Sequence, residues 1–204
     1  MSAQRKYVDD FVDEASYFVL AEKSDVRLEY VDGFVRAMAG TSRLQANINS
    51  RILAALATVL RDGPCEVVAS DLRIRPAGST RYYYPDIAVY CENAEFDENA
   101  PNTLLSPTIL VEVLSDSTAH IDRTEKLDVY LAIPTLRHYL MVDQSRVRIE
   151  HFHRAETAEW HFDAYLWRRD TISFPDLNVS IPVEEIYRRL DLPEGFILMS
   201  EDTE

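Results

Sequence analysis

The sequence lacks any long apolar run. None of its hydrophobic stretches approaches the roughly 18 residues that a membrane-spanning helix needs. The first twenty residues carry acidic side chains where a secretory signal would need an uninterrupted apolar stretch. We therefore expect a cytoplasmic protein that contacts no membrane.

Cysteine and glycine are also scarce. The two cysteines, Cys65 and Cys91, are far apart in the sequence and belong to no metal-binding spacing. This usage is typical of a reduced, intracellular setting. The five glycines never form a run, so no glycine-rich loop is present to bind phosphates. Ser115 and Ser117 have neither an elbow motif nor a partner histidine, which argues against a serine nucleophile.

Basic residues are few relative to acidic ones. The chain has 21 Lys and Arg against 35 Asp and Glu, which gives a formal net charge of −14. Proteins that bind nucleic acid through charge alone are basic, so we expect weak non-specific affinity unless a metal offsets the acids or basic groups cluster. Three short segments are either such clusters or solvated strand ends and turns: Arg73, Arg75 and Arg81; Arg146, Arg148 and Arg154; Arg168 and Arg169.

The hydrophobic pattern predicts an N-terminal helix, a hairpin and a long helix. Residues 7–20 have apolar side chains at near-helical spacing, among them Phe11 and Val19. The segment LEYVDGFVRAMAG alternates around Asp32-Gly33, a strong signal for a two-residue hairpin. Thr41 or Ser42 can cap the long helix, and Gly63-Pro64 ends it. The apolar face of that helix is Ile48, Ile52, Ala55, Leu56 and Val59.

Three strands, a helix and a fourth strand follow. The strands are CEVVASDLRIRP, RYYYPDIAVYC and SPTILVEVLS, and the second and third are apolar enough to be covered on both faces. Asp122 and Glu125 form a capping-box pattern for a helix that ends near Ala132, and RHYLMVDQ is the next strand. This order predicts an α/β sandwich core with a mixed sheet.

We expect a single domain over residues 1–204, with its core at about 41–143 and the helix and hairpin at 7–40. RVRIEHFHR and EWHFDAYLW indicate a β meander within a C-terminal extension over 145–190. A short helix near Glu184–Leu190 closes it. Residues 191–204 form a tail that we expect to be flexible.

Two carboxylates lie inside apolar strands. Glu112 shares its strand face with Leu110 and Leu114, and Asp86 lies on the preceding strand. An ionised carboxylate is costly there unless a cation compensates it. If the strands are neighbours, the two side chains lie about 5 Å apart and repel each other. Magnesium binds one or two carboxylates, so we predict that Asp86 and Glu112 hold Mg²⁺, with Mn²⁺ as a substitute.

Lys126 is the third candidate site residue. It lies at the edge of the apolar stripe of the following helix, so its ammonium can reach the strand ends. There it stabilises charge at a phosphate or orients the attacking water. The alternative is an ordinary ion pair with Asp122, one helical turn away. Glu29 either completes the acid shell of the metal or is an exposed strand residue, and Asp71 is either a supporting acid or a strand-end group bonded to backbone.

The strings LEYVDGFVRAMAG, YYYPDIAVYC and ILVEVLSDSTAHIDRTEKLDVYLAIPTLRHYLMVDQ together resemble the Uma-two family of restriction endonucleases, which is placed in the PD-(D/E)XK nuclease superfamily. The resemblance runs from about residue 7 to 190. It implies a restriction-endonuclease-like core of order α-β-β-β-α-β, with a mixed central sheet flanked by helices. It also implies a metal-dependent endonuclease that acts on nucleic acid, DNA in the first place, and that can pair as a homodimer to cut both strands.

Carried onto this sequence, the family pattern makes Asp86 and Glu112 the two acids of the motif. The lysine that usually follows the second acid by two residues would fall at Leu114, so the resemblance implies that Lys126 supplies it from the helix. The backbone carbonyl of Val113 completes the metal ligands.

This chain departs from the family pattern at two places. Relatives often carry a histidine at the start of the long helix, where this chain has Leu44-Gln45. The histidine that would assist a catalytic step there is therefore absent from this position. They also often read Leu-Ser-Pro-Ser where this chain has Leu114-Ser115-Asp116-Ser117, and both versions can turn the chain towards the helix.

Other functions stay open at this point. A catalytically inactive binding or assembly module with a nuclease fold is favoured by the acidic composition and by Leu114. A metal-dependent hydrolase of another phosphate ester is the third possibility. His151 and His153 share a strand face at a metal-binding spacing, but no third ligand is near in sequence, so the alternative is an exposed hairpin. The tyrosines 82–84 either stack on bases or form a half-buried strand.

Overall fold

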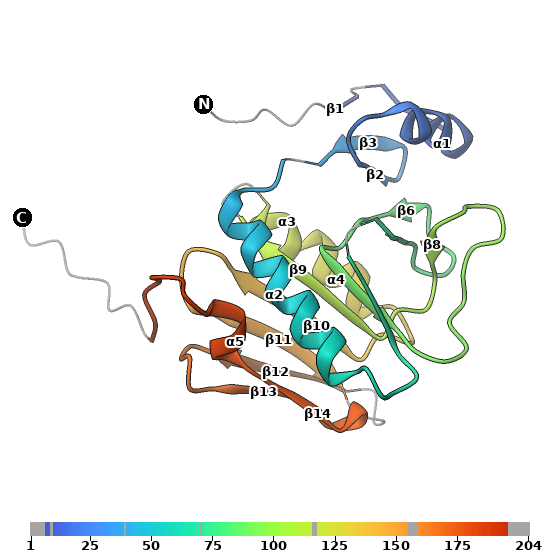
Figure 1. Cartoon of the computed structure of the whole chain (residues 1–204). Helices are drawn as coiled ribbons and strands as arrows, with labels where there is room; N and C mark the ends of the chain where they lie inside the picture. Colours follow the sequence, from blue (N-terminus) through green and yellow to red (C-terminus); the bar gives the residue numbers. More distant parts are fainter. Residues whose placement is uncertain are drawn as a thin grey trace, which may run out of the picture.

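A six-stranded mixed sheet forms the centre of the structure, a computed structural model that describes residues 7–195 except 9, 39, 70, 116, 117 and 155–158 (Figure 1). The strand order is β12-β11-β10-β9-β7-β4. Strands β9 and β10 run parallel, whereas the other neighbouring pairs in this sheet are antiparallel. The bounds of these strands are β4 (Glu66–Ala69), β7 (Ile87–Tyr90), β9 (Ile109–Leu114), β10 (His138–Asp143), β11 (Ile149–Arg154) and β12 (Trp160–Tyr165).

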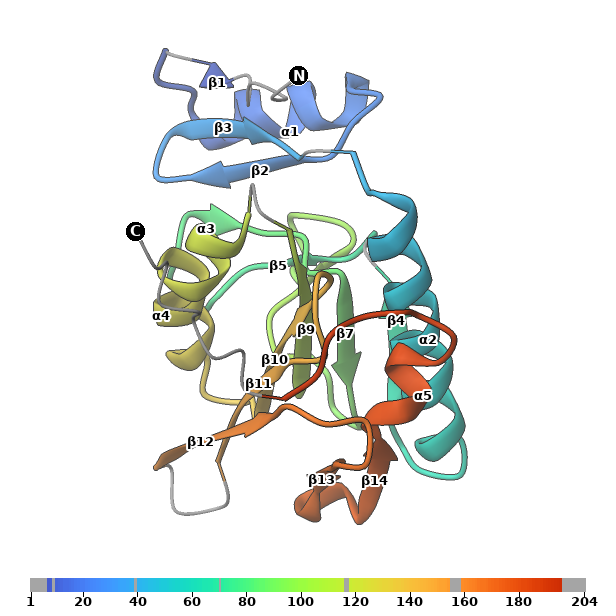
Figure 2. The same cartoon turned by 90° about the vertical axis from the view of Figure 1, so that its left-hand side faces the viewer.

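Helices cover both faces of this sheet (Figure 2). Helices α2 and α5 pack on one face together with the hairpin of β13 and β14, and α4 packs on the other face beside α3. The helix bounds are α2 (Arg43–Val59), α3 (Ala119–Arg123), α4 (Glu125–Leu131) and α5 (Val183–Tyr187). The hairpin consists of β13 (Thr171–Phe174), a 3₁₀ turn over Pro175–Leu177 and β14 (Val179–Pro182).

Strand β9 is buried along its whole length, as its continuous apolar sequence predicts. Val111 and Val113 face the core under α2, whereas Leu110 and Leu114 face the core under α4. Because side chains alternate across a strand, Glu112 lies on the α4 side, in the middle of the sheet. The predicted strand over SPTILVEVLS is therefore confirmed, and it carries a carboxylate into a covered region.

Helix α2 forms as its sequence predicts. Ser42, not Thr41, is its N-cap, and the Ser42 hydroxyl accepts a hydrogen bond from the backbone N–H of Gln45. Ile48, Ile52 and Leu56 are fully buried against the sheet, whereas Ala55 and Val59 are half-buried. The helix ends just before the predicted Gly63-Pro64 stop.

A second, four-stranded sheet and helix α1 (Glu14–Lys23) form an N-terminal lobe above one end of the central sheet (Figure 2). The predicted hairpin is confirmed, because Asp32 and Gly33 turn the chain with positive φ values of 51° and 98°. The strand order is β1-β3-β2-β6, with bounds β1 (Tyr7–Val8), β2 (Leu28–Val31), β3 (Phe34–Ala37) and β6 (Arg81–Tyr82).

The predicted helix over residues 7–20 is wrong in its start and in its buried face. Its first residues form β1, and α1 begins only after Asp13, whose carboxylate accepts a hydrogen bond from the N–H of Ser16. Phe11 is 74% exposed and Val19 is 50% exposed, whereas Tyr17 is fully buried. The aromatic packing of the lobe, and not the apolar spacing along 7–20, selects the face of α1.

Three further predicted elements are divided in the structure. RYYYPDIAVYC supplies β6 to the N-terminal lobe and β7 to the central sheet, because Pro85 separates the two segments. CEVVASDLRIRP gives β4 and then β5 (Arg73–Ile74), which pairs with β8 (Thr103–Leu104) in the segment between β7 and β9. The predicted helix at 122–132 is α3 and α4 with a break at Thr124, so Asp122 is no cap and is instead buried inside α3.

The two cysteines are joined by a disulfide, which the expectation of a reduced setting did not anticipate. Cys65 precedes β4 and Cys91 follows β7, and these strands pair with Glu66 opposite Tyr90. The pairing register therefore places the cysteines side by side although 26 positions separate them in the sequence. Disulfides are rare in reduced compartments, so this correction also removes one reason for the cytoplasmic prediction.

The C-terminal part follows the prediction in outline. Strands β10, β11 and β12 form the meander, and the closing helix is α5, which ends at Tyr187. Residues 196–204 of the predicted tail lie outside the described residues. No helix in the described part of the chain has both the length and the apolar content to span a bilayer.

Candidate active site

Asp86 and Glu112 come from neighbouring segments at one end of the central sheet. Strands β7 and β9 are antiparallel, and their pairing ends with Ile87 opposite Val111. Asp86 lies in the bend directly before β7, and its carboxylate accepts a hydrogen bond from the N–H of Val113, the residue after Glu112. Glu112 therefore lies within its predicted strand, whereas Asp86 lies just outside the strand predicted to contain it.

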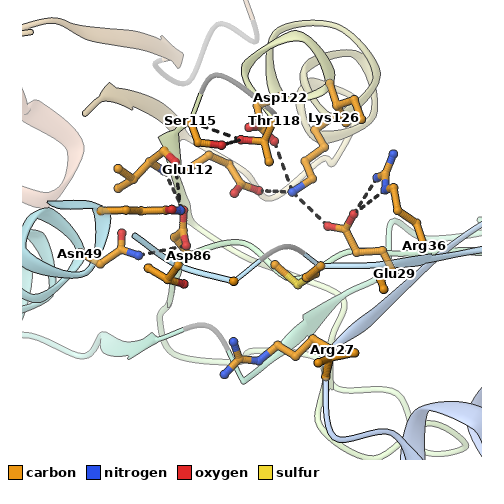
Figure 3. A pocket seen from close by; sticks show the side chains of 18 of the residues that line it. Arg27, Glu29, Arg36, Asn49, Asp86, Glu112, Ser115, Thr118, Asp122 and Lys126 are labelled. Carbon is orange, nitrogen blue, oxygen red and sulfur yellow. Dashed lines mark hydrogen bonds and ion pairs between the residues drawn. The ribbon is translucent and has the colours of Figure 1, made fainter. Parts of the chain in front are cut away.

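Both acids line a pocket of about 480 Å³ between the end of the sheet, helices α2 and α3/α4 and the N-terminal hairpin (Figure 3). Acidic side chains outnumber basic ones in its wall. The acidic lining residues are Asp25, Glu29, Asp71, Asp86, Glu112 and Asp122, and the basic ones are Arg27, Arg36 and Lys126. The pocket is thus suited to a cation more than to an uncompensated anion.

Two donors from different elements hold the carboxylate of Asp86. Its Oδ2 accepts a hydrogen bond of 2.7 Å from the N–H of Val113 on β9, and its Oδ1 accepts one of 3.0 Å from Nδ2 of Asn49 on α2. Burial raises the pKa of Asp86, although both hydrogen bonds oppose the rise. The carboxylate is fixed in orientation while one lone pair on each oxygen stays available.

Glu112 is 4% exposed and contacts two side chains of α4. Its Oε1 accepts hydrogen bonds from Nζ of Lys126 at 2.8 Å and from the hydroxyl of Tyr130 at 3.2 Å. Its Oε2 accepts none from the described residues. Burial raises the pKa of Glu112 well above its ordinary value, and the nearby carboxylates of Asp122 and Asp86 add to the effect while Lys126 opposes it.

Lys126 is the centre of the charge network in the pocket (Figure 3). Its ammonium lies 2.8 Å from Glu112, 3.0 Å from Glu29 and 3.4 Å from Asp122. Burial alone would lower its pKa, but these carboxylates hold the pKa of Lys126 well above its ordinary value. The predicted approach to Glu112 and the alternative ion pair with Asp122 therefore occur together.

Glu29 reaches the pocket from β2 of the N-terminal lobe and is 4% exposed, so it is not an exposed strand residue. Its Oε1 faces Lys126, and its Oε2 lies 2.7 Å from the guanidinium of Arg36 on the adjacent strand β3. These two cations lower the pKa of Glu29 despite its burial. Because both of its oxygens lie next to cations, Glu29 is arranged to orient Lys126. Its role as a metal ligand stays a prediction.

Asn49 and Arg36 also belong to the pocket, and sequence reasoning missed both. Asn49 follows Gln45 by one helical turn, and these are the two amide side chains of α2 that point at the strand ends. That spacing was a usable signal. Arg36 gave none, because only the hairpin register, with Glu29 opposite Arg36, brings the pair together.

Gln45 occupies the place where relatives often carry a histidine. Its Nε2 donates a hydrogen bond of 3.3 Å to the carbonyl of Val113. Asp71 lies at the rim, where its side chain is 86% exposed and paired with Arg27. Among the described residues, the partner of its carboxylate is therefore Arg27 and not the backbone.

The residues present fit a hard divalent cation. The donors available are the carboxylates of Asp86 and Glu112 and the carbonyl of Val113, all oxygen atoms of the type that magnesium prefers. Within the described residues, no three Asp, Glu, His or Cys side chains gather closely enough to form a metal site by themselves. A cation bound here therefore depends on the backbone carbonyl, and on water, as well as on the two acids. The buried Oδ1 of Asn49, which has no hydrogen-bond partner among the described residues, fits an acceptor for the water of a hydrated cation.

The other candidate features have structural roles. Tyr82, Tyr83 and Tyr84 are buried, so the interpretation as base-stacking side chains is wrong in this structure. Most of the basic segments are neutralised by acids, which agrees with solvated strand ends and turns. The ion pairs are Arg75 with Asp97, Arg81 with Asp32, Arg146 with Asp143, and Arg148 with Glu150.

His151 is buried, and within the part of the chain that the structure describes it forms no metal site with His153. Its Nε2 lies 3.0 Å from Nδ1 of His138, whose Nε2 lies 2.7 Å from the carboxylate of Asp176. His153 instead faces Asp163 at 2.9 Å. The expectation of an exposed hairpin is wrong for His151, and the chain of two imidazoles and one carboxylate joins β10 and β11 to the C-terminal hairpin.

Stability should fall in mild acid because of His151. Burial, followed by the neighbouring His138 and His153, lowers the pKa of His151 to about 3. Below the ordinary value near 6.5 the unfolded chain takes up a proton that the folded protein excludes, so the free energy of unfolding falls by about 2 kcal/mol between pH 7 and pH 5. Urea unfolding at both pH values measures this loss, and His151→Leu should remove it. The exposed His161 on β12 provides the control, and a His161→Leu variant with the same effect as His151→Leu would contradict the assignment.

Comparison with known proteins agrees with this fold. A family model described as "Putative restriction endonuclease", Uma2, matches residues 14–184. Two uncharacterized proteins of Synechocystis sp. strain PCC 6803 are similar along most of the chain. The protein sll1609 is 28% identical over 165 residues, covering 81% of this chain and 93% of its own length. The protein slr1290 is 32% identical over 174 residues, covering 85% and 90%.

A solved structure has the same fold. The crystal structure from Anabaena variabilis that is described as a "putative nuclease belonging to DUF820" superposes with a TM-score of 0.70 at 14% sequence identity. The match covers 86% of this chain and 97% of that chain. The mixed sheet flanked by helices is therefore the nuclease-type fold that the sequence predicts. Since the family model spans most of the chain, this protein belongs to the Uma2 (Uma-two) family of restriction-endonuclease-like proteins.

Proposed function

We propose that this protein is a magnesium-dependent endonuclease that hydrolyses phosphodiester bonds of nucleic acid with an activated water molecule. The observation that carries the proposal is the meeting of Asp86, Glu112 and Lys126 in one pocket. The description of the family as "Putative restriction endonuclease", and that of the Anabaena structure as a "putative nuclease", support the reaction class. DNA as the substrate, and pairing of two chains to cut both strands, follow from the same resemblance.

The charges of the pocket support a divalent cation. Six acidic and three basic side chains line the pocket, so six negative charges minus three positive ones leave an excess of three when all are ionised. A bound Mg²⁺ would offset two of these three charges. A metal also accounts for how a chain of net charge −14 can act on a polyanion, since the cation and not the protein surface would meet the phosphate.

The residues of the chain then have distinct roles. Asp86, Glu112 and the carbonyl of Val113 would hold the cation, which, when bound, lowers the pKa of a water molecule and neutralises charge on the phosphate. The Lys126 ammonium is oriented by Glu29 and stabilises the negative charge that develops on the phosphoryl oxygens. Glu112 contacts Lys126 through Oε1 alone, so its Oε2 is free to face the cation.

Nicking of supercoiled plasmid DNA tests the proposal. We expect cutting with Mg²⁺ or Mn²⁺ that EDTA stops, and a loss of at least about 100-fold in Asp86→Ala and Glu112→Gln, because several kcal/mol of transition-state stabilisation depend on the metal. Asp62→Asn changes an exposed carboxylate at the end of α2 and should cut like the wild type.

Equal nicking by the wild type and Asp86→Ala would assign the cutting to a contaminant. A wild type that neither cuts nor binds Mg²⁺ would favour the inactive binding module, which the acidic composition also favours. Activity on simple phosphate esters, with none on DNA or RNA, would favour the third function.

A further inference from the structure

Helix α2 contacts both groups that the metal assignment places next to each other. Gln45 and Asn49 are one helical turn apart and therefore point in the same direction. Gln45 donates to the carbonyl of Val113 at 3.3 Å, and Asn49 donates to Oδ1 of Asp86 at 3.0 Å. The carboxylate of Asp86 and the carbonyl of Val113 are thus each held by an amide side chain of the same helix.

The contact with Asn49 decides the orientation of Asp86. The second oxygen of Asp86 accepts a hydrogen bond from the N–H of Val113 at 2.7 Å. A carboxylate that is held at one oxygen can rotate about that bond, whereas one held at both oxygens cannot. The Asn49 amide is therefore the group that stops Asp86 from turning out of the pocket.

The other end of the Asn49 amide points to a ligand. Its Oδ1 is buried and has no hydrogen-bond partner among the described residues. A buried acceptor without a donor is destabilising, and in most proteins it is paired with protein or with water. Asn49 lines the same pocket as Asp86 and Glu112. A bound Mg²⁺ keeps several water molecules, whose hydrogens need acceptors of this kind.

We propose that Asn49 is a positioning residue for the divalent cation. Its Nδ2 fixes the carboxylate of Asp86, and its Oδ1 accepts a hydrogen bond from the hydration shell of the cation. The inference rests on the proposed function only in taking Asp86 as a metal ligand. It adds a residue from α2 to a site that the family pattern assigns to strands and to the helix of Lys126.

Isothermal titration of the full chain with MgCl₂ tests the proposal without any nuclease assay. We expect Asn49→Ala and Asn49→Leu to bind Mg²⁺ about 10- to 100-fold more weakly than the wild type, the range found when groups that support metal ligands are removed. Asn49→Leu keeps the volume of the side chain and so limits any effect of a cavity. Asn47→Ala is the matched control, because Asn47 is exposed on the same helix and should leave the affinity unchanged.

The thermal midpoint in EDTA separates positioning from folding. Weaker Mg²⁺ binding together with a midpoint close to that of Asn47→Ala supports the inference. An affinity within about twofold of the wild type overturns it and leaves the metal assignment intact. A lower midpoint with unchanged affinity, or a variant that does not fold, assigns Asn49 to the fold and also overturns it. If the wild type binds no Mg²⁺, both the inference and the proposed metal fail.

Discussion

Replacing Lys126 with methionine is expected to lower the free energy of unfolding by about 3–5 kcal/mol at neutral pH, because it leaves buried carboxylates without their shared counter-charge. Glu112, Glu29 and Asp122 each contact this ammonium and are each at most 4% exposed. Methionine fills a similar volume, so the loss reports charge more than packing. Urea unfolding of the wild type and the variant in EDTA measures the difference.

The pH dependence of this loss separates charge from shape. In the variant, burial without the ammonium raises the folded-state pKa of Glu112 further above that of the unfolded chain, so the difference in stability from the wild type should narrow as the pH falls from 7 to 5. Lys23→Met is the control, because Lys23 is exposed at the end of α1. If Lys126→Met lowers the free energy of unfolding no more than Lys23→Met does, then the buried carboxylates around Lys126 are neutral and not ionised. Their role in binding a cation is then contradicted.

The network around Lys126 also explains why the N-terminal lobe belongs to the site. Glu29 and Arg36 face each other across the β2–β3 hairpin, and both are buried at the pocket. Arg36 extends the network to Glu125 on α4 at 3.1 Å. The lobe is thus joined by ion pairs to the helix that carries Lys126, and its position sets where the ammonium points.

The acids of the site could be predicted from the sequence because their signal is local. Glu112 interrupts an apolar strand and Asp86 directly precedes one, and burial of a carboxylate needs a physical reason wherever it occurs. Lys126 follows from the helical stripe beside it. The sequence gives Arg36 no signal and Asn49 only its spacing from Gln45, and only the register of the hairpin and the packing of α2 give these two residues their partners.

The errors in the fold share one cause, which is that tertiary pairing overrides local pattern. Tyr82 continues an apolar run with β7 in the sequence, yet it pairs with Tyr30 in the other sheet. Tyr17 is buried against Tyr30 and Tyr82, so the buried face of α1 is not the one that its apolar spacing predicts. The assignment of β6 and β7 to different sheets cannot be read from period and propensity alone.

The disulfide is the error with the largest consequence for stability. Cys65→Ser/Cys91→Ser is expected to lower the free energy of unfolding by about 3.5 kcal/mol, because the bond closes a loop between cysteines 26 positions apart and reduces the entropy of the unfolded chain. The bond also joins the edge strand β4 to β7 at one end of their paired segment, next to the pair of Glu66 and Tyr90. Urea unfolding of the oxidised wild type and of the double variant measures the difference.

Reduction provides the matched control for this prediction. Dithiothreitol should destabilise the wild type by nearly the same amount as the double substitution, and it should leave the double variant unchanged, because that variant has no bond to break. Cys65→Ser and Cys91→Ser alone should each equal the double variant for the same reason. A wild type that is insensitive to reductant, with two titratable thiols, would mean that the cysteines are free in solution, as the expected reducing setting requires. Mg²⁺ binding should survive in the double variant, since Asp86 precedes β7 at the end opposite Cys91 and is held there by Val113 and Asn49.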